Sequence, residues 1–292
     1  MTEDEPRPAL DNLRNFRGGV ASPIEAVKLR LLPSSFEIDG AASPRQHLTC
    51  LLVNQTVAVD AGSLAMAVSD AERATIRDVV LTHAHLDHVA GLPLFIDDQF
   101  SELTEAVRIH ATHEVIEILE RDIFNWSVYP RFSELANSHG KVLDYRPFKQ
   151  GESFKVGDLV FDAIEVNHKV PCSGFVVSDG PVSIAITGDT ANMDRFWEAV
   201  AERPISALLI ECAFPDELSE LADMSHHLTP MALAKELEKF RQSDCDILVV
   251  NIKPSYRTTV LRELEELRIP NLSIMEVGRE YEWNSDSLHQ VT

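Results

Sequence analysis

The sequence has few basic residues for its length. Its 292 residues include 26 lysines and arginines against 47 aspartates and glutamates, which gives a formal net charge of −21 at pH 7. A surface this negative repels a phosphate backbone unless a local basic patch or a metal ion offsets the charge. The composition therefore disfavours binding to long nucleic acids.

The sequence also lacks cysteine pairs and long apolar stretches. Its cysteines, Cys50, Cys172, Cys212 and Cys245, are widely separated and form no C-x-x-C motif, so we expect reduced, buried thiols. No stretch approaches the roughly 18 apolar residues that a membrane span needs, and the acidic N-terminus has no apolar signal segment. These absences predict a cytoplasmic protein with no membrane partner.

The distribution of polar and apolar residues predicts one folded domain between two short end segments. Residues 1–24 are polar, contain prolines and a Gly-Gly pair and show no sustained periodicity, which predicts a mobile arm. We assign residues 25–284 to a single domain and residues 285–292 to a C-terminal tail. With 45% hydrophobic residues, a chain of this length can bury a large core.

Short apolar, β-branched runs alternate with helical patterns. Strands are expected at residues 48–53, 56–59, 79–82, 159–166, 174–177, 182–187, 207–210 and 247–250. Apolar residues recur every three or four positions in residues 115–123, 196–200, 233–240 and 260–267, which indicates helices. Because strands dominate the first half and alternate with helices in the second, we expect an α/β fold in which helices cover sheets.

The sharpest chemical signal is a histidine-rich segment at the end of a predicted strand. Residues 82–91 read Thr-His-Ala-His-Leu-Asp-His-Val-Ala-Gly, which places three histidines and an aspartate within six positions. Neutral imidazoles and carboxylates bind Zn, Mn or Fe, and a loop at a strand end can aim alternate side chains at one point. The segment therefore predicts a metal site, and we expect Gly62 and Gly91 to allow backbone turns that approach it.

The motif at residues 83–88, His-x-His-x-Asp-His, resembles the signature of the metallo-β-lactamase fold. Two later positions also match that family, because His168 follows one predicted strand and Asp189 lies in Thr-Gly-Asp-Thr after another. At the position of the family's last histidine ligand, this chain has Asn251. The resemblance implies an αββα sandwich in which two central mixed sheets are flanked by helices.

Within that superfamily the sequence is most similar to class II cyclic-nucleotide phosphodiesterases and, more distantly, to tRNase Z. The similar segments are residues 123–125 with Pro130, 188–190, 210–215, 227–230 and 251–254. The resemblance implies hydrolysis of the 3′,5′-cyclic phosphodiester of a nucleotide, first of all cAMP, by attack of a metal-bound hydroxide. The alternatives are a metallohydrolase of another ester, such as an RNA end, a phosphonate or a thioester, and a non-catalytic metal- or ligand-binding protein.

The resemblance implies one or two divalent metal ions, Zn in the first place, with Mn, Fe or Mg as alternatives. The implied ligands of the first metal are the imidazoles of His83, His85 and His168. The implied ligands of the second are Asp87 and His88, with Asp189 bridging both metals. Asn251 leaves three interpretations open, a weak second site, a one-metal enzyme or a protein without catalysis, because an amide oxygen binds Zn less well than imidazole does.

The resemblance also implies an acid in the site. His227 matches the family's position for protonating the leaving alkoxide, and an imidazole near its normal pKa suits that role at neutral pH. Glu211 could orient His227 by accepting its other N–H, although an exposed loop glutamate is the alternative. We count Asp87 with these two as catalytic residues.

Three residues are candidates for holding the substrate. Lys253 and Arg131 could each place a positive charge beside a phosphate, and Asn125 belongs to an aromatic segment that could stack on a base. An ordinary surface lysine and core packing of the aromatic segment are the alternatives. We expect a small phosphodiester as the substrate, and the aromatics near Trp126 could support a homodimer.

Overall fold

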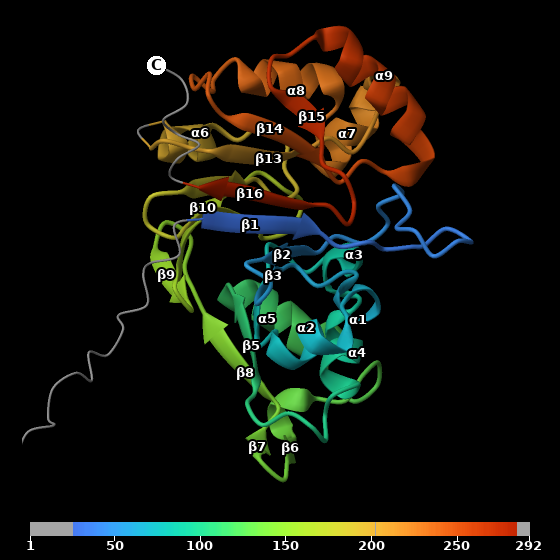
Figure 1. Ribbon diagram of the computed structural model, residues 1–292, viewed down its shortest axis with the longest axis vertical. Helices are drawn as coiled ribbons and strands as arrows, with labels where there is room; N and C mark the ends of the chain where they lie inside the picture. Colours follow the sequence, from blue (N-terminus) through green and yellow to red (C-terminus); the bar gives the residue numbers. More distant parts are fainter. Residues whose placement is uncertain (1–25, 202, 285–292) are drawn as a thin grey trace, which may run out of the picture.

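Two seven-stranded sheets form the centre of the molecule, and helices cover their outer faces (Figure 1). The computed structural model describes residues 26–201 and 203–284. The predicted N-terminal arm and C-terminal tail lie outside the described residues. The arrangement is the αββα sandwich that the sequence predicted.

The first sheet has the strand order β16-β1-β2-β3-β4-β5-β8. Its strands are β1 (Ala26–Leu31), β2 (Leu51–Val53), β3 (Val57–Val59), β4 (Asp78–Val80), β5 (Val107–Ala111), β8 (Leu143–Pro147) and β16 (Glu280–Asn284). The strands from β3 to β8 run parallel, and parallel neighbours need crossover connections. Much of that connecting chain is helical: α1 (Leu64–Ala67), α2 (Asp70–Thr75), α3 (Leu86–Val89), α4 (Leu92–Asp97) and α5 (His113–Ile118).

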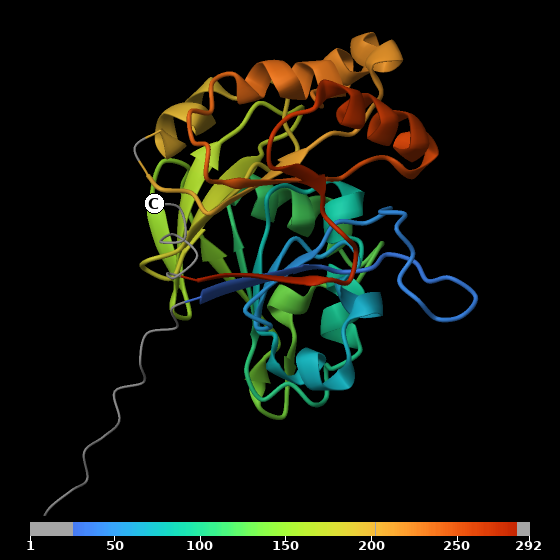
Figure 2. The same cartoon turned by 45° about the horizontal axis from the view of Figure 1, so that its top comes forward.

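The second sheet has the order β15-β14-β13-β12-β11-β10-β9. Its strands are β9 (Ser153–Val156), β10 (Leu159–Glu165), β11 (Ser173–Ser178), β12 (Ser183–Ile186), β13 (Ala207–Glu211), β14 (Asp246–Val250) and β15 (Leu272–Ile274). Its parallel half, from β12 to β15, is connected through α6 (Asp194–Val200), α7 (Ser219–Ser225), α8 (Pro230–Leu237) and α9 (Arg257–Leu267). Figure 2 shows these four helices together on the outer face of this sheet.

Shorter elements complete the described chain. They are the π-helical turn η1 (Leu119–Ile123), the 3₁₀ turns η2 (Phe132–Glu134), η3 (Asp216–Leu218) and η4 (Pro254–Tyr256), and a small hairpin of β6 (Ala136–Asn137) and β7 (Gly140–Lys141). The predicted helix at residues 115–123 therefore changes to a wider turn after Ile118, where the Phe124 N–H bonds to the Leu119 carbonyl at 2.8 Å. No helix within the described ranges is long and apolar enough to cross a membrane.

Apolar side chains between the two sheets fix their relative position. In β1 buried and half-buried residues alternate, so Val27, Leu29 and Leu31 join the core that also contains Phe161 and Phe175 of the second sheet. Separate cores lie under the helices of each layer. The loops that follow the parallel strands β3, β4, β12, β13 and β14 leave this packed frame at its edge, which is where α/β proteins commonly place their ligand sites.

Candidate metal centre

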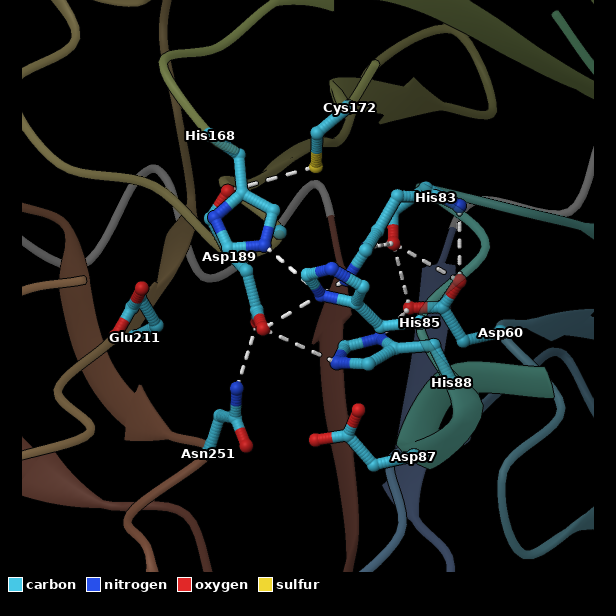
Figure 3. A network of polar contacts seen from close by, with 12 residues as sticks. Asp60, His83, His85, Asp87, His88, His168, Cys172, Asp189, Glu211 and Asn251 are labelled. Atoms are coloured by element: carbon cyan, nitrogen blue, oxygen red, sulfur yellow. Dashed lines mark hydrogen bonds and ion pairs between the residues drawn. The ribbon is translucent and has the colours of Figure 1, made fainter. Parts of the chain in front are cut away.

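Side chains from both sheets converge at this edge (Figure 3). His83 and His85 follow β4, His88 lies in α3, His168 lies between β10 and β11, and Asp189 follows β12. The Oδ2 atom of Asp189 is 3.8 Å from Nε2 of His83 and 3.3 Å from Nε2 of His88. Residues about a hundred positions apart in the sequence thus form one cluster.

Three imidazoles of this cluster are placed as a ligand set. His83, His85 and His168 each offer a ring nitrogen, and these atoms lie within 4.8 Å of one another. The Nε2 atom of His168 is 3.1 Å from Nδ1 of His85. His83 Nε2 and His88 Nε2 are buried and have no hydrogen-bond partner among the described residues. Buried nitrogens without a partner are costly, so a divalent cation fits this donor set.

Neighbouring groups fix how each ring faces the cluster. The Nδ1 atom of His168 donates to the carbonyl of His226 at 3.0 Å, which leaves Nε2 as the unprotonated nitrogen. Asp60 Oδ2 lies 2.7 Å from His88 Nδ1 and fixes how that ring faces the cluster. Thr82 Oγ1 lies 2.9 Å from His83 Nδ1. Such partners set the tautomer and orientation of metal-binding histidines.

Asp60 was not recognised as functional from the sequence. It is buried at the end of β3, has a φ of 60°, and accepts hydrogen bonds from the backbone N–H of Thr82 at 2.8 Å and from Oγ1 of Thr82. Asp60 contacts the ring of His88 directly and reaches the ring of His83 through the hydroxyl of Thr82. The only sequence signal was an aspartate after an apolar strand, and that signal becomes informative once β3 and β4 are known to be neighbours.

Burial sets the protonation of the cluster. It lowers the pKa of His83 well below 6.5, lowers the pKa of His85 and lowers the pKa of His168 to about 4, so these rings are neutral and have a lone pair for a metal. Burial alone would raise the pKa of Asp189, but the adjacent imidazoles, led by His88, hold it well below 3.8. The centre therefore combines three neutral imidazoles with an ionised carboxylate. Burial alone would also lower the pKa of His88, but the carboxylates of Asp189 and Asp60 raise it well above 6.5.

Asp87 and Asn251, the other predicted ligands, have different partners. Asp87 belongs to none of the ligand clusters found in the described residues, and its Oδ2 atom lies 3.0 Å from Nζ of Lys253. The Asn251 side chain is buried after β14, and its amide donates from Nδ2 to Oδ1 of Asp189 at 2.6 Å. The metal-binding roles of Asp87 and Asn251 stay predictions, and so does the substrate role of Lys253, which lies beside Asp87.

Glu211 and His227 form the predicted pair. Glu211 is fully buried at the end of β13, which excludes the alternative of an exposed loop residue, and its Oε1 lies 2.7 Å from Nδ1 of His227. Oε1 also accepts from the backbone N–H of Thr190 at 2.9 Å. Burial alone would lower the pKa of His227, but the Glu211 carboxylate raises it above 6.5. His227 Nδ1 lies 4.0 Å from Asp189 Oδ2.

The other two predicted substrate contacts hold a loop together. Asn125 Oδ1 accepts from the N–H groups of Ser127 and Val128, at 3.0 and 2.8 Å. Arg131 donates from Nε to the carbonyl of Phe124 and forms ion pairs with Glu120 and Glu134. Within the described chain no hydrogen bond or ion pair links Asn125 or Arg131 to the histidine cluster, and their substrate roles stay predictions.

The backbone role predicted for two glycines is confirmed. A Cβ on Gly62 would lie 2.0 Å from the carbonyl oxygen of Asp87, and one on Gly91 would lie 2.6 Å from that of Ala61. Both glycines let the segment after β3 lie against the histidine-rich loop, where the Ala61 N–H bonds to the His88 carbonyl at 2.7 Å. Any side chain here would push the ligand loop away.

Comparison with known proteins agrees with this geometry. Residues 56–245 match the family model of the beta-lactamase superfamily domain, and this segment makes up more than half of the chain. The chain therefore belongs to the beta-lactamase superfamily, a superfamily of hydrolytic enzymes, and the family predicted from the sequence is confirmed.

Named relatives include phosphodiesterases and a ribonuclease. A probable 3′,5′-cyclic-nucleotide phosphodiesterase of Yersinia pestis is 28% identical over 225 residues, which are 66% of this chain and 64% of that protein, so the match spans less than two thirds of the relative. The chloroplastic tRNase Z TRZ2 of Arabidopsis thaliana is 26% identical over 149 residues, or 49% of this chain and 37% of that one. The crystal structure of unliganded yeast PDE1 superposes with a TM-score of 0.70 at 17% identity, over 88% of this chain and 99% of that one, which shows the shared fold.

Proposed function

We propose that the protein is a metal-dependent phosphodiesterase that hydrolyses the 3′,5′-cyclic phosphodiester of a nucleotide, with cAMP as the first substrate to test. The observation that carries the proposal is the Glu211–His227 pair beside the histidine cluster, because it sets an acid next to a candidate metal site. The similarity to a probable cyclic-nucleotide phosphodiesterase supports the same reaction.

The residues that would hold a divalent ion are His83, His85 and His168, with Asp189 beside them. Nitrogen donors with a carboxylate favour Zn over Mg or Ca, with Mn and Fe as further candidates. Such an ion, when bound, supplies positive charge that polarises a phosphoryl oxygen and activates water. The low pKa of Asp189 keeps its carboxylate charged, so it offsets part of the charge of the cation.

The chain's own residues supply the proton. His227 is held through Nδ1 by Glu211, so its Nε2–H remains to protonate the leaving oxygen of the sugar. The raised pKa of His227 means that a larger fraction of the protein carries this proton at neutral pH. Lys253, whose Nζ is bonded to Asp87 beside the cluster, can attract an anionic substrate.

The net charge favours a small substrate over a large RNA. At −21 the surface opposes the extended phosphate contacts that RNA binding needs, although the similarity to tRNase Z keeps an RNA end as the second candidate. The four cysteines are free and buried, in accord with the reducing cytoplasm expected from the sequence. The predicted homodimer stays a prediction.

The test is the production of 5′-AMP from 3′,5′-cAMP by the purified protein with added Zn or Mn. We expect turnover that a chelator abolishes, and a loss of about 10²–10⁴ in kcat for His227→Asn. His139→Asn, at an exposed loop histidine, is the matched control and should keep full activity. Cleavage of a precursor-tRNA end without turnover of cAMP would instead favour the ribonuclease reaction.

A further inference from the structure

We propose that the centre binds one divalent ion tightly and that the ammonium group of Lys253 takes the place of a second one. The inference rests on the proposed metal-dependent function and specifies how many ions that function uses. It concerns the side of the cluster where the sequence has Asn251 in place of a histidine ligand.

The candidate ligands are divided unequally between the two sides. On one side His83, His85 and His168 bring three ring nitrogens together, and the buried Nε2 of His83 has no partner among the described residues. On the other side the carboxylate of Asp87 is bonded to Lys253, and the amide of Asn251 is bonded to Asp189. On that second side His88 and Asp189 still converge with His83, and the buried Nε2 of His88 has no partner among the described residues. What the second side lacks is the two further ligands that Asp87 and Asn251 would supply, because both are engaged by protein groups.

Asn251 acts on Asp189 as a donor. Its Nδ2 atom lies 2.6 Å from Oδ1 of Asp189, so the N–H occupies that carboxylate oxygen. Oδ2 is then the oxygen that faces the imidazoles of His83 and His88. A φ of 55° at Asn251, a conformation that asparagine adopts more readily than most residues, turns the side chain toward Asp189. The amide thus restricts Asp189 where a histidine would have offered a lone pair to a metal.

Lys253 is fixed beside Asp87 by the fold. Its backbone N–H bonds to the Ala213 carbonyl at 3.2 Å, and Pro254 follows it at the start of η4. The side chains of Lys253 and Asp87 are both about 30% exposed, with Nζ 3.0 Å from Oδ2. A cation that approached Asp87 would have to displace this ammonium or bind against its positive charge. The ammonium therefore neutralises Asp87 and leaves a positive group that a phosphate can meet.

The test is the metal content of the full-length protein after equilibration with buffered Zn, measured by mass spectrometry of the metal and by titration calorimetry. The variants are Lys253→Met, Asn251→His and the double variant, which removes the ammonium and restores the imidazole. Lys28→Met is the matched control, because Lys28 is also paired with carboxylates, at 3.2 Å from Glu282, but on β1. Circular dichroism and thermal melting check the folding of each variant.

We expect one tight Zn per chain in the wild-type protein and in Lys28→Met. In the double variant a second Zn should bind more tightly than in the wild-type protein by roughly tenfold or more, as for changes in groups around a metal site. Two equally tight ions in the wild-type protein would overturn the inference even if the double variant fails to fold. A folded double variant that still binds one ion would overturn it too.

Metal content is measured without substrate, so this outcome is separate from that of the proposed function. A protein that binds one tight Zn and gains a second in the double variant, but hydrolyses no phosphodiester, would support the inference and contradict the proposed reaction. A chelator-sensitive hydrolase with two tight ions would do the reverse.

Discussion

The Nδ1 atom of His227 lies 2.7 Å from Oε1 of Glu211, a carboxylate that is fully buried. Burial alone would lower the pKa of His227, and Glu211 raises it above the usual 6.5. His227 therefore keeps its proton over a wider range of pH than a free histidine does. A group that must be protonated to act loses its function as the pH rises through its pKa.

Glu211→Gln should shift the alkaline limb of the kcat profile to lower pH. The substitution removes the negative charge that raises the pKa of His227, so burial then dominates and the imidazole loses its proton at lower pH. The measurement is kcat from about pH 5 to pH 9. Glu236→Gln is the control, because Glu236 is also buried but bonds to Trp197 at 2.8 Å, and it should leave the limb in place. If wild type and Glu211→Gln had the same alkaline limb, the Glu211–His227 pair would not be what raises the pKa of the catalytic acid.

Chelation should lower the melting temperature of the wild-type protein. A metal that binds only the folded state stabilises it, by about 2.7 kcal/mol at a free concentration of one hundred times Kd. His168→Ala removes one of the three clustered imidazoles, so its melting temperature should respond much less to chelator. Differential scanning calorimetry with and without chelator gives both values. Equal responses in the two proteins would mean that His168 binds no metal.

Asp60→Ala should weaken Zn binding by about 10- to 100-fold, although Asp60 is not one of the clustered ligands. The carboxylate holds Thr82 against His83 and accepts from His88, so its loss frees the orientation of two imidazoles. Asp78→Ala is the matched control. Asp78 likewise bonds to a buried histidine, His110, at 2.8 Å, but away from the cluster. Both variants should lose stability, and only Asp60→Ala should lose metal affinity in a competition titration with a zinc chelator.

Gly62→Ala should cost more stability than Gly40→Ala and should also lower metal affinity. A Cβ at Gly62 would lie 2.0 Å from a backbone oxygen, and backbone cannot move aside as a side chain does, so we expect a loss of about 1–3 kcal/mol or more. Gly40 has a φ of +84° but open space around it, so Gly40→Ala should lower the free energy of unfolding by about 1 kcal/mol. Urea unfolding measures both losses. Equal losses would show that the ligand loop can move away from Gly62.

The sequence predicts the buried strands well and the strands with polar faces poorly. β11 and β13 are buried on both faces and contain continuous apolar runs, Phe-Val-Val at residues 175–177 and Ala-Leu-Leu-Ile at residues 207–210. β1 contains Lys28 and Arg30, and β16 reads Glu-Tyr-Glu-Trp-Asn, so neither looks like a core strand. They are strands because each pairs with the other at the edge of the sheet, a contact between opposite ends of the chain.

The same limit applies to the site. The histidines of residues 83–88 are close in sequence, so their spacing alone reveals them. Asp60 and the carbonyl of His226 act on ligands that come from other strands and loops, and only the folded chain brings them there. The donor role of Asn251 depends on its backbone angle and on Asp189, which residue type alone does not give.

The cluster unites two segments of chain that belong to different sheets, with His85 and His168 lying 83 residues apart in sequence. An ion held by both would tie the two sheets together in the folded protein, across a loop of that length. Unlike a disulfide, which also constrains the unfolded chain, such an ion would act on the folded state alone, in a protein whose cysteines are all free. Chelation would thus release a cross-link as well as a cofactor, and hydrogen exchange should accelerate first where the two sheets meet at the cluster.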